Sequence, residues 1–427
     1  MTVIDLGELR DDTAPEPPVP RRPATGRPYR SLVVLLLVLV TLAGAAPTPG
    51  RVVATVPGGP AAAAFVAGDR VYVVQAPDPQ RGVGRQLVAY RVDPGPPRPI
   101  WRTLLPGDGV ATTVWEQDGT VLLVGRTAND AGWETVAFDA GTGRVGWRQS
   151  GVAFPAGDGV VLQQFAAAGR EPIQRVEVRT GRTRWSMPVA RDELELSFGP
   201  AGVDRLVALP ASGAAEVFDA RTGVRLVARD LRPGELPARP RTLLAAGLLL
   251  LIRDAGGTVT GYDLDTLDPR WTVSIPLVGY AEPCGRLLCA SRQTGGMWAL
   301  DPASGAIRWT DDRWASALAA GGGRLLVAAG TPAGTELAVV EEASGRLVAD
   351  LGDWELVPQG ETDGRVIGIR RGGDGRLLVA ELDPAAGRAR VRDSLSGAVG
   401  DCRIGAAVLL CRRSDGSFGV WPMGRAT

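Results

Sequence analysis

The sequence contains no histidine and no lysine, so all 47 of its basic residues are arginine. The absence of histidine removes the side chain that most often acts as a general base or a metal ligand. The absence of lysine removes lysine-type bases and the lysine of a phosphate-binding loop. Many hydrolase and nucleotide-binding mechanisms are therefore disfavoured, and pairs of carboxylates remain as the chemistry to consider.

Aromatic residues make up only 5% of the chain, and neither sign of charge is in excess, since Asp and Glu also total 47. The balanced charge gives no support for nucleic-acid binding, which requires a basic face. The 57 glycines and 33 prolines interrupt a chain that is 45% hydrophobic. This composition favours an all-β fold of many short strands over long helices.

A long uncharged run lies near the N-terminus. Residues 1–30 are rich in proline, arginine and acid, and we expect them to form a disordered cytoplasmic tail. Ser31–Ala46 would span about 24 Å as a helix, which is short but sufficient for a single-pass membrane anchor. Because arginines such as Arg27 and Arg30 precede it, we expect a cytoplasmic N-terminus and an extracytoplasmic region at residues 47–427.

The same segment also fits a cleaved signal peptide, since Ala43–Ala45 matches a small-residue cleavage site. The tail of 30 residues before it is long for a signal peptide, which favours the anchor. Either alternative exports residues 47–427, and cleavage would make the protein secreted.

A nine-residue frame recurs through the exported region, with DAGTGRVGW at 139–147 as a clear copy. An acid opens the frame, glycine follows four places later in six copies, and tryptophan follows eight places later in five. The acids are Asp93, Asp139, Glu177, Asp219, Asp263, Asp301, Glu341 and Asp383. The tryptophans are Trp101, Trp147, Trp185, Trp271 and Trp309. Successive acids are 38 to 46 residues apart, and this spacing is typical of a β-propeller with one four-stranded blade per repeat.

Short segments of alternating polarity around each frame supply the strands, for example Gly68–Gln75, Leu87–Asp93 and Pro99–Leu105. We expect the acid to end the third strand and to accept hydrogen bonds from the following turn. Glycine would allow the left-handed backbone of that turn. Tryptophan would lie on the outer strand and wedge between blades, so these acids and tryptophans are interpreted as structural.

The segments AFDAGTGRVGW (Ala137–Trp147) and ALDPASGAIRW (Ala299–Trp309) resemble the tryptophan-docking repeat of the pyrroloquinoline-quinone (PQQ) enzyme-like β-propeller family, in its membrane-anchored bacterial type. The resemblance covers nearly everything after Arg51 and implies a propeller fold. The family includes quinoprotein alcohol dehydrogenases, lipoprotein scaffolds for outer-membrane protein assembly, and other surface proteins.

The dehydrogenases of this family usually use a disulfide between adjacent cysteines and a calcium site made by Asp, Asn and Glu. This chain has no adjacent cysteines and a single asparagine, Asn129. No position matches their catalytic residues. We therefore predict no cofactor and no metal, although the resemblance itself brings PQQ into consideration.

The two ends of the exported region look like parts of one blade. Arg51–Pro57 has the pattern of an outer strand with no blade before it, whereas Ala398–Pro422 supplies strands with no outer strand after them. We expect the two ends to pair and close the ring, which removes exposed sheet edges. Counting frames then gives nine blades, whereas the family most often shows eight, and both counts stay open.

The four cysteines fall into two pairs, Cys284 with Cys289 and Cys402 with Cys411, each across a predicted hairpin turn. Side chains across a hairpin lie near disulfide distance, and an oxidising compartment favours these two bonds. Free thiols and a metal site are the alternatives. The metal site lacks both the C-x-x-C spacing and a histidine.

We predict from these features a non-catalytic binding or scaffold module on the extracytoplasmic side, held at the membrane by Ser31–Ala46. Its partner would be an unidentified protein or glycan. Two alternatives stay open. One is a PQQ-dependent oxidoreductase, and the other is a cell-envelope protein that binds glycan or cleaves it through carboxylates.

Overall fold

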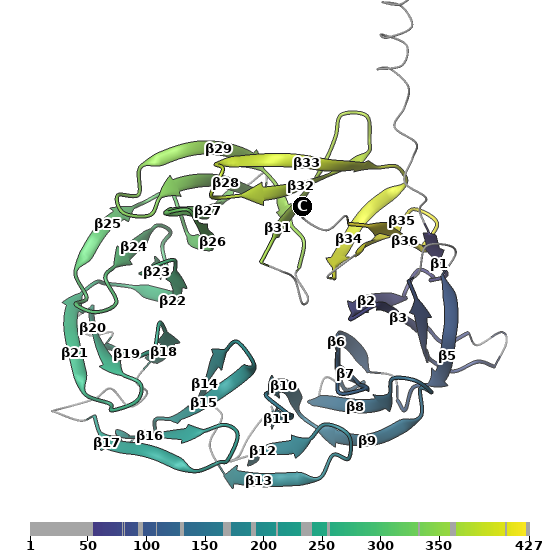
Figure 1. Cartoon of the computed structure of the whole chain (residues 1–427), viewed down its shortest axis with the longest axis horizontal. Coiled ribbons are helices and arrows are strands. Elements are labelled where there is room, and N and C mark those ends of the chain that lie inside the picture. The colour runs from purple at the N-terminus through teal and green to yellow at the C-terminus, as the bar shows by residue number, and fades with distance from the viewer. Residues whose placement is uncertain are drawn as a thin grey trace, which may run out of the picture. The chain divides into compact units, whose positions relative to one another are not determined.

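The described part of the chain contains 36 short strands (Figure 1). The computed structural model describes residues 54–78, 80, 82–92, 97–107, 109–128, 132–164, 172–188, 194–210, 212–231, 241–253, 257–331, 334–358, 364–405 and 408–423. The predicted tail at 1–30 and the predicted anchor Ser31–Ala46 lie outside these residues. Within the described ranges, no helix is long and apolar enough to cross a membrane.

The strands follow one another along the chain in groups of four, apart from the first and the last three. The first seventeen are β1 (Ala54–Val56), β2 (Ala63–Ala67), β3 (Arg70–Gln75), β4 (Gln86–Arg91), β5 (Arg98–Leu104), β6 (Val110–Gln117), β7 (Thr120–Arg126), β8 (Trp133–Asp139), β9 (Val145–Ser150), β10 (Val152–Ala156), β11 (Gly159–Gln163), β12 (Pro172–Glu177), β13 (Thr183–Pro188), β14 (Leu194–Gly199), β15 (Gly202–Ala208), β16 (Ala214–Asp219) and β17 (Arg225–Asp230). The others are β18 (Arg241–Ala245), β19 (Leu248–Arg253), β20 (Thr258–Asp263), β21 (Pro269–Ser274), β22 (Val278–Cys284), β23 (Leu287–Arg292), β24 (Met297–Leu300), β25 (Ile307–Asp311), β26 (Ser316–Gly321), β27 (Arg324–Thr331), β28 (Gly334–Glu341), β29 (Leu347–Asp353), β30 (Glu355–Leu356), β31 (Val366–Arg371), β32 (Leu377–Asp383), β33 (Arg388–Leu395), β34 (Ala398–Ile404), β35 (Val408–Arg413) and β36 (Phe418–Pro422).

Hydrogen bonding groups these strands into eight antiparallel sheets, seven with four strands and one with eight. The eight-stranded sheet contains two four-stranded units, β10–β13 and β14–β17, which are joined where Ala156 pairs with Gly202. The described residues thus form eight sheets and nine four-stranded units. The sequence left eight and nine blades open. The shared sheet gives eight blades when it is counted once, and nine when its two units are counted separately.

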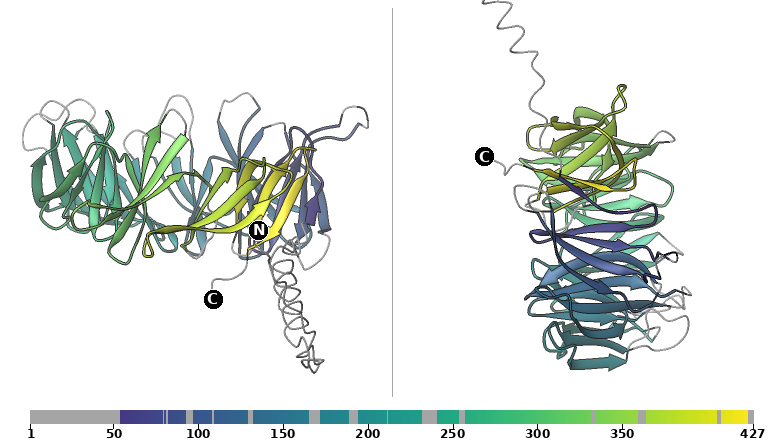
Figure 2. Two further views of the ribbon diagram at one scale, coloured as in Figure 1. Left: turned by 90° about the horizontal axis from the view of Figure 1, so that it is seen from above. Right: turned by 90° about the vertical axis from the view of Figure 1, so that its right-hand side faces the viewer.

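The ring closes through the two ends of the region, as the sequence predicts. β1 pairs antiparallel with β36, with Thr55 opposite Gly419, and completes the sheet β1-β36-β35-β34. The first strand of each unit, such as β2 or β6, lies toward the common axis, and the fourth lies at the rim (Figure 1). Figure 2 shows the same strands from two sides.

The strands predicted at Gly68–Gln75, Leu87–Asp93 and Pro99–Leu105 correspond to β3, β4 and β5 within two residues at each end. Their alternating pattern gives this agreement, because side chains that point to opposite faces of a strand meet different surroundings. The core lies between neighbouring sheets. One cluster joins Tyr72 and Trp101 of one unit to Phe138 of the next, and all three side chains are buried.

Candidate functional site

The described repeat aspartates lie at the end of the third strand of a unit or, for Asp301, directly after it, and face the turn that follows. Asp139 ends β8, and its Oδ1 accepts hydrogen bonds from the backbone N–H of Thr142 at 2.8 Å and from the Thr142 hydroxyl at 2.7 Å. The bond from the hydroxyl is the largest cause that lowers the pKa of Asp139. The carboxylates that accept from the backbone N–H three places later in the same way are Asp219, Asp263, Asp301 and Asp383.

The repeat glutamates make different contacts. Glu177 accepts from the guanidinium groups of Arg182 and Arg184, at 3.1 and 3.0 Å. The carboxylate of Glu341 accepts from the hydroxyl of Ser344, two residues before Arg346, which also donates to it. The longer glutamate side chain extends beyond the backbone donors, so side-chain donors hold it instead. The remaining repeat acid, Asp93, lies outside the described residues.

Five of the six repeat glycines receive the tryptophan of the preceding unit. Gly181 has a φ of +67°, and a Cβ built on it would lie 2.6 Å from Cγ of Trp147. Trp147 donates its indole N–H to the carbonyl oxygen of Val178 at 2.7 Å. The equivalent indole bonds run from Trp101 to Ala140, from Trp271 to Pro302 and from Trp309 to Glu342. Glycine is therefore required twice, for its backbone conformation and for the room it leaves.

Trp185 departs from this pattern. Its ring lies over Gly223, where a Cβ would come within 2.8 Å of Cγ of the indole. The buried Nε1 of Trp185, however, has no acceptor within the part of the chain that the structure describes. The junction between β10–β13 and β14–β17 is thus built differently from the other four tryptophan junctions.

Both disulfides predicted from the hairpin spacing are present. Cys284 and Cys289 join β22 to β23 with their Cα atoms 5.7 Å apart. Cys402 and Cys411 join β34 to β35 with their Cα atoms 4.1 Å apart. Each bond therefore fastens the first strand of a unit to its second.

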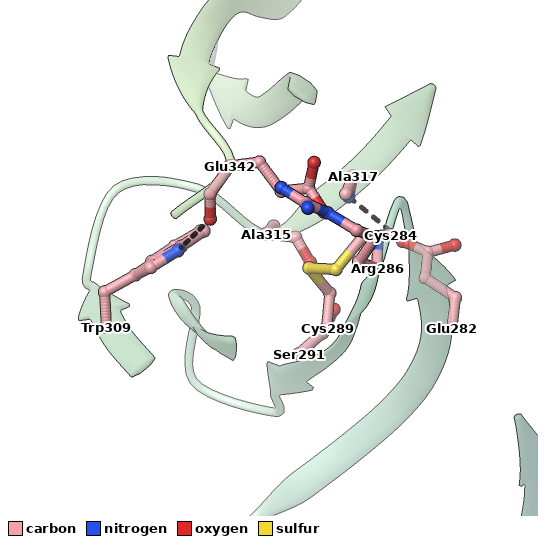
Figure 3. Close-up of a disulfide and its surroundings, with 9 residues drawn as sticks. All are labelled: Glu282, Cys284, Arg286, Cys289, Ser291, Trp309, Ala315, Ala317 and Glu342. Atoms are coloured by element: carbon pink, nitrogen blue, oxygen red, sulfur yellow. Dashed lines mark hydrogen bonds and ion pairs between the residues drawn. A yellow bond between two sulfur atoms is a disulfide. The ribbon is translucent and has the colours of Figure 1, made fainter. Parts of the chain in front are cut away.

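The turn closed by Cys284 and Cys289 holds a carboxylate of the next unit (Figure 3). Glu342 is buried, and its Oε1 accepts from the backbone N–H of Arg286 at 2.6 Å. A Cβ on Gly285 would lie 2.8 Å from that oxygen, so glycine leaves the space for it. The backbone carbonyl of Glu342 also accepts the indole N–H of Trp309, so one residue receives bonds from two elements of the preceding unit.

A pocket of about 590 Å³ lies among the inner strands of five consecutive units. Trp115 and Glu116 of β6 line it, together with the turns between β2 and β3, β10 and β11, and β14 and β15. Most of the lining is apolar or glycine, and its apolar members include Val66, Pro155 and Pro200. A pocket of this size with few polar groups is typical of a ligand-binding site.

Glu116 is the ionisable side chain of the pocket lining, and residues behind it hold it in place. Its Oε2 accepts from the hydroxyl of Tyr72 at 2.8 Å, and its Oε1 lies 3.4 Å from Nη1 of Arg70. Burial and this bond raise the pKa of Tyr72, so the hydroxyl stays a donor at neutral pH. The neighbouring indole Nε1 of Trp115 is buried and has no acceptor among the described residues. The repeat frame did not predict any of these residues, because they lie on strands outside it.

The pocket lining does not fit PQQ. The cofactor carries several carboxylates, whereas the lining offers the carboxylate of Glu116 and no arginine to balance them. Neither disulfide contributes to the lining. Across the described residues, no three His, Cys, Asp or Glu side chains lie together in a way that could hold a metal ion. This lining would therefore not hold the cofactor.

Comparison with known structures gives low sequence identities. BamB from Moraxella catarrhalis is 14% identical with a TM-score of 0.45, and the match covers 86% of this chain and 95% of that one. The computationally designed Ika8 protein is 18% identical with a TM-score of 0.46, covering 75% and 98%. A europium-containing methanol dehydrogenase is 12% identical with a TM-score of 0.42, covering 77% and 83%. A comparison with curated proteins found no match.

A sequence profile described as "Outer membrane protein assembly factor BamB" matches residues 41–273 and 212–353, well over half of the 427 residues. The four-stranded units and the docking of each tryptophan onto the following turn agree with the resemblance seen in the sequence. The chain belongs to the PQQ-like β-propeller repeat family that this BamB profile describes.

Proposed function

We propose that this protein is a non-catalytic scaffold that binds a partner protein through the pocket on its inner strands. The observation that carries the proposal is the character of the lining, in which turns and apolar side chains surround a single carboxylate, that of Glu116. Such groups recognise and orient a ligand, because they offer shape, apolar surface and a few fixed hydrogen bonds.

We also propose that the propeller acts on the extracytoplasmic side of a membrane, with Ser31–Ala46 as its anchor. Two disulfides support an oxidising compartment. In intact cells, external protease should digest the propeller and spare an N-terminal tag. The mass of the protein separates the alternatives, because a cleaved signal peptide would leave a chain that begins near residue 47.

Site-specific cross-linking in living cells tests the scaffold proposal. Ala201 lines the pocket at the turn between β14 and β15, and a photoreactive phenylalanine there points toward a bound partner. The matched control is Ala343, an exposed alanine in the turn between β28 and β29. We expect protein adducts from position 201 alone, and weaker ones in the E116Q variant. Equal adducts at both positions, or none at 201, would overturn the proposal.

A titration with PQQ and calcium separates the scaffold from an oxidoreductase. The full-length protein in detergent is mixed with both, and dye reduction is followed with simple alcohols and aldoses as substrates. We expect neither saturable binding nor dye reduction, because Glu116 would repel the cofactor's carboxylates. Saturable binding with turnover would contradict the proposed function.

A further inference from the structure

A second cavity, of about 330 Å³, lies at the junction between β10–β13 and β14–β17. Three arginines line it: Arg175 from β12, Arg184 from β13, and Arg221 from the turn between β16 and β17. This is the junction at which Trp185, another lining residue, has an indole N–H without an acceptor in the described chain. The departure from the repeat geometry and the cluster of arginines thus coincide.

Arg175 forms the base of this cavity, and its side chain is only 8% exposed. Its Nη1 donates to the carbonyl of Arg221 at 2.9 Å, and its Nη2 donates to the carbonyl of Ala156 at 3.0 Å and to the carboxylate of Asp158. A Cβ on Gly159 would lie 2.9 Å from Nη2, so glycine makes room for the guanidinium. The buried Nε of Arg175 has no acceptor in the described residues.

The charges of the lining leave a positive excess. Asp158 and Glu177 are its two carboxylates, so three arginines against two acids give one net positive charge. The Asp158 side chain is 83% exposed, so solvent weakens its hold on Arg175. Glu177 is shared between Arg184 and Arg182, which lies outside the cavity lining. The guanidinium of Arg184 is about half exposed and can turn toward a ligand.

We propose that this cavity binds a phosphoryl group. Arginine presents a planar fork of N–H donors that matches the oxygens of phosphate, and two or three such forks fix it in one orientation. Arg184 and Arg221 would hold the group at the open side, above the buried guanidinium of Arg175. The site is separate from the pocket that contains Glu116, so it does not depend on the proposed scaffold function.

Isothermal titration of the full-length protein tests this site, with inorganic phosphate as one probe and glycerol phosphate as the other. Ionic strength is held constant with chloride, because nonspecific binding to arginine depends on salt. We expect saturable binding of at least one probe. Tighter binding of glycerol phosphate would indicate an esterified ligand such as a lipid headgroup, whereas tighter binding of inorganic phosphate would indicate the free ion.

Three variants decide whether the cavity is the site. R221Q and R184Q should each weaken binding about tenfold, and R308Q should leave it unchanged. Arg308 is the matched control, because it precedes Trp309 as Arg184 precedes Trp185 and also pairs with its repeat acid. Thermal melting confirms that the variants fold. Absence of saturable binding to the wild-type protein, or equal affinity in R221Q, would overturn the proposal.

Discussion

At the scale of single residues, glycine and tryptophan of neighbouring repeats act as one pair. Trp147 packs where a Cβ of Gly181 would lie, although the two residues belong to different units. At one junction both the tryptophan and the glycine are replaced by other residues. Val227 stands in place of a tryptophan, and the following turn has Leu267 at the glycine position, fully buried in the cluster that Val227 packs against. A larger residue on the turn thus fills the space that a missing indole leaves.

Replacing Gly181 with alanine should therefore destabilise the protein through two effects. The φ of +67° disfavours any side chain, and the new Cβ would meet the indole of Trp147 at 2.6 Å. We expect a loss of about 2 kcal/mol or more in the free energy of unfolding, measured by urea denaturation. G387A is the control. Its φ is similar, at +65°, but the nearest atom is Nη1 of Arg324 at 3.1 Å, so its loss should be smaller. Equal losses would show that packing plays no part.

The repeat aspartates should make the stability of the fold sensitive to acid. Hydrogen bonds, first that from Arg308, lower the pKa of Asp301 in the folded chain. A carboxylate with a lowered pKa stabilises the fold above its unfolded pKa of about 4, and this contribution is lost as the pH falls through that range. We expect the urea midpoint to fall between about pH 5 and about pH 3.

The D301N variant should show a smaller fall over that interval, because it no longer carries the titrating group. D353N serves as its control, since Asp353 is an exposed acid outside the repeat frame. If the urea midpoint of D301N fell with pH as much as that of the wild-type protein, Asp301 would not be a source of the acid sensitivity.

At the scale of elements, alternation of side chains predicted strands such as β3 and β5 to within two residues. It also placed the cysteines across hairpins, because both features depend on contacts close in sequence. The two cavities could not be predicted in this way. Arg175 reaches the carbonyl of Arg221, 46 residues later, and that contact depends on the angle between units. Trp115 and Glu116 belong to an ordinary strand pattern and gain their significance only from the neighbouring turns.

The tryptophan junctions should respond differently to loss of the indole N–H. W147F keeps an aromatic ring but removes the donor to Val178, so we expect a loss of about 1 kcal/mol or more from the missing bond and the smaller ring. W185F should cost less, because its N–H has no acceptor in the described chain. Urea denaturation of both variants measures the difference. A larger loss in W185F would show that its N–H is bonded in solution.

At the scale of the whole propeller, the ring depends on three residues at its start. β1 spans Ala54–Val56 and is the only strand of its sheet that comes from the beginning of the described chain. A chain that starts at Gly58 would leave the edge of β36 unpaired and exposed. We expect a lower melting temperature and faster amide exchange in β35 and β36, measured by hydrogen–deuterium exchange. Unchanged exchange there would show that the closing strand contributes nothing to stability.

The order in which the chain is made gives this closure a further consequence. β1 is synthesised before every other described strand, whereas its partner β36 is synthesised after all of them. Contacts between residues so far apart form slowly, because a long loop must close before they can stabilise anything. Until β36 has been made, therefore, β1 lacks its partner strand, and its unpaired edge can pair with another strand instead.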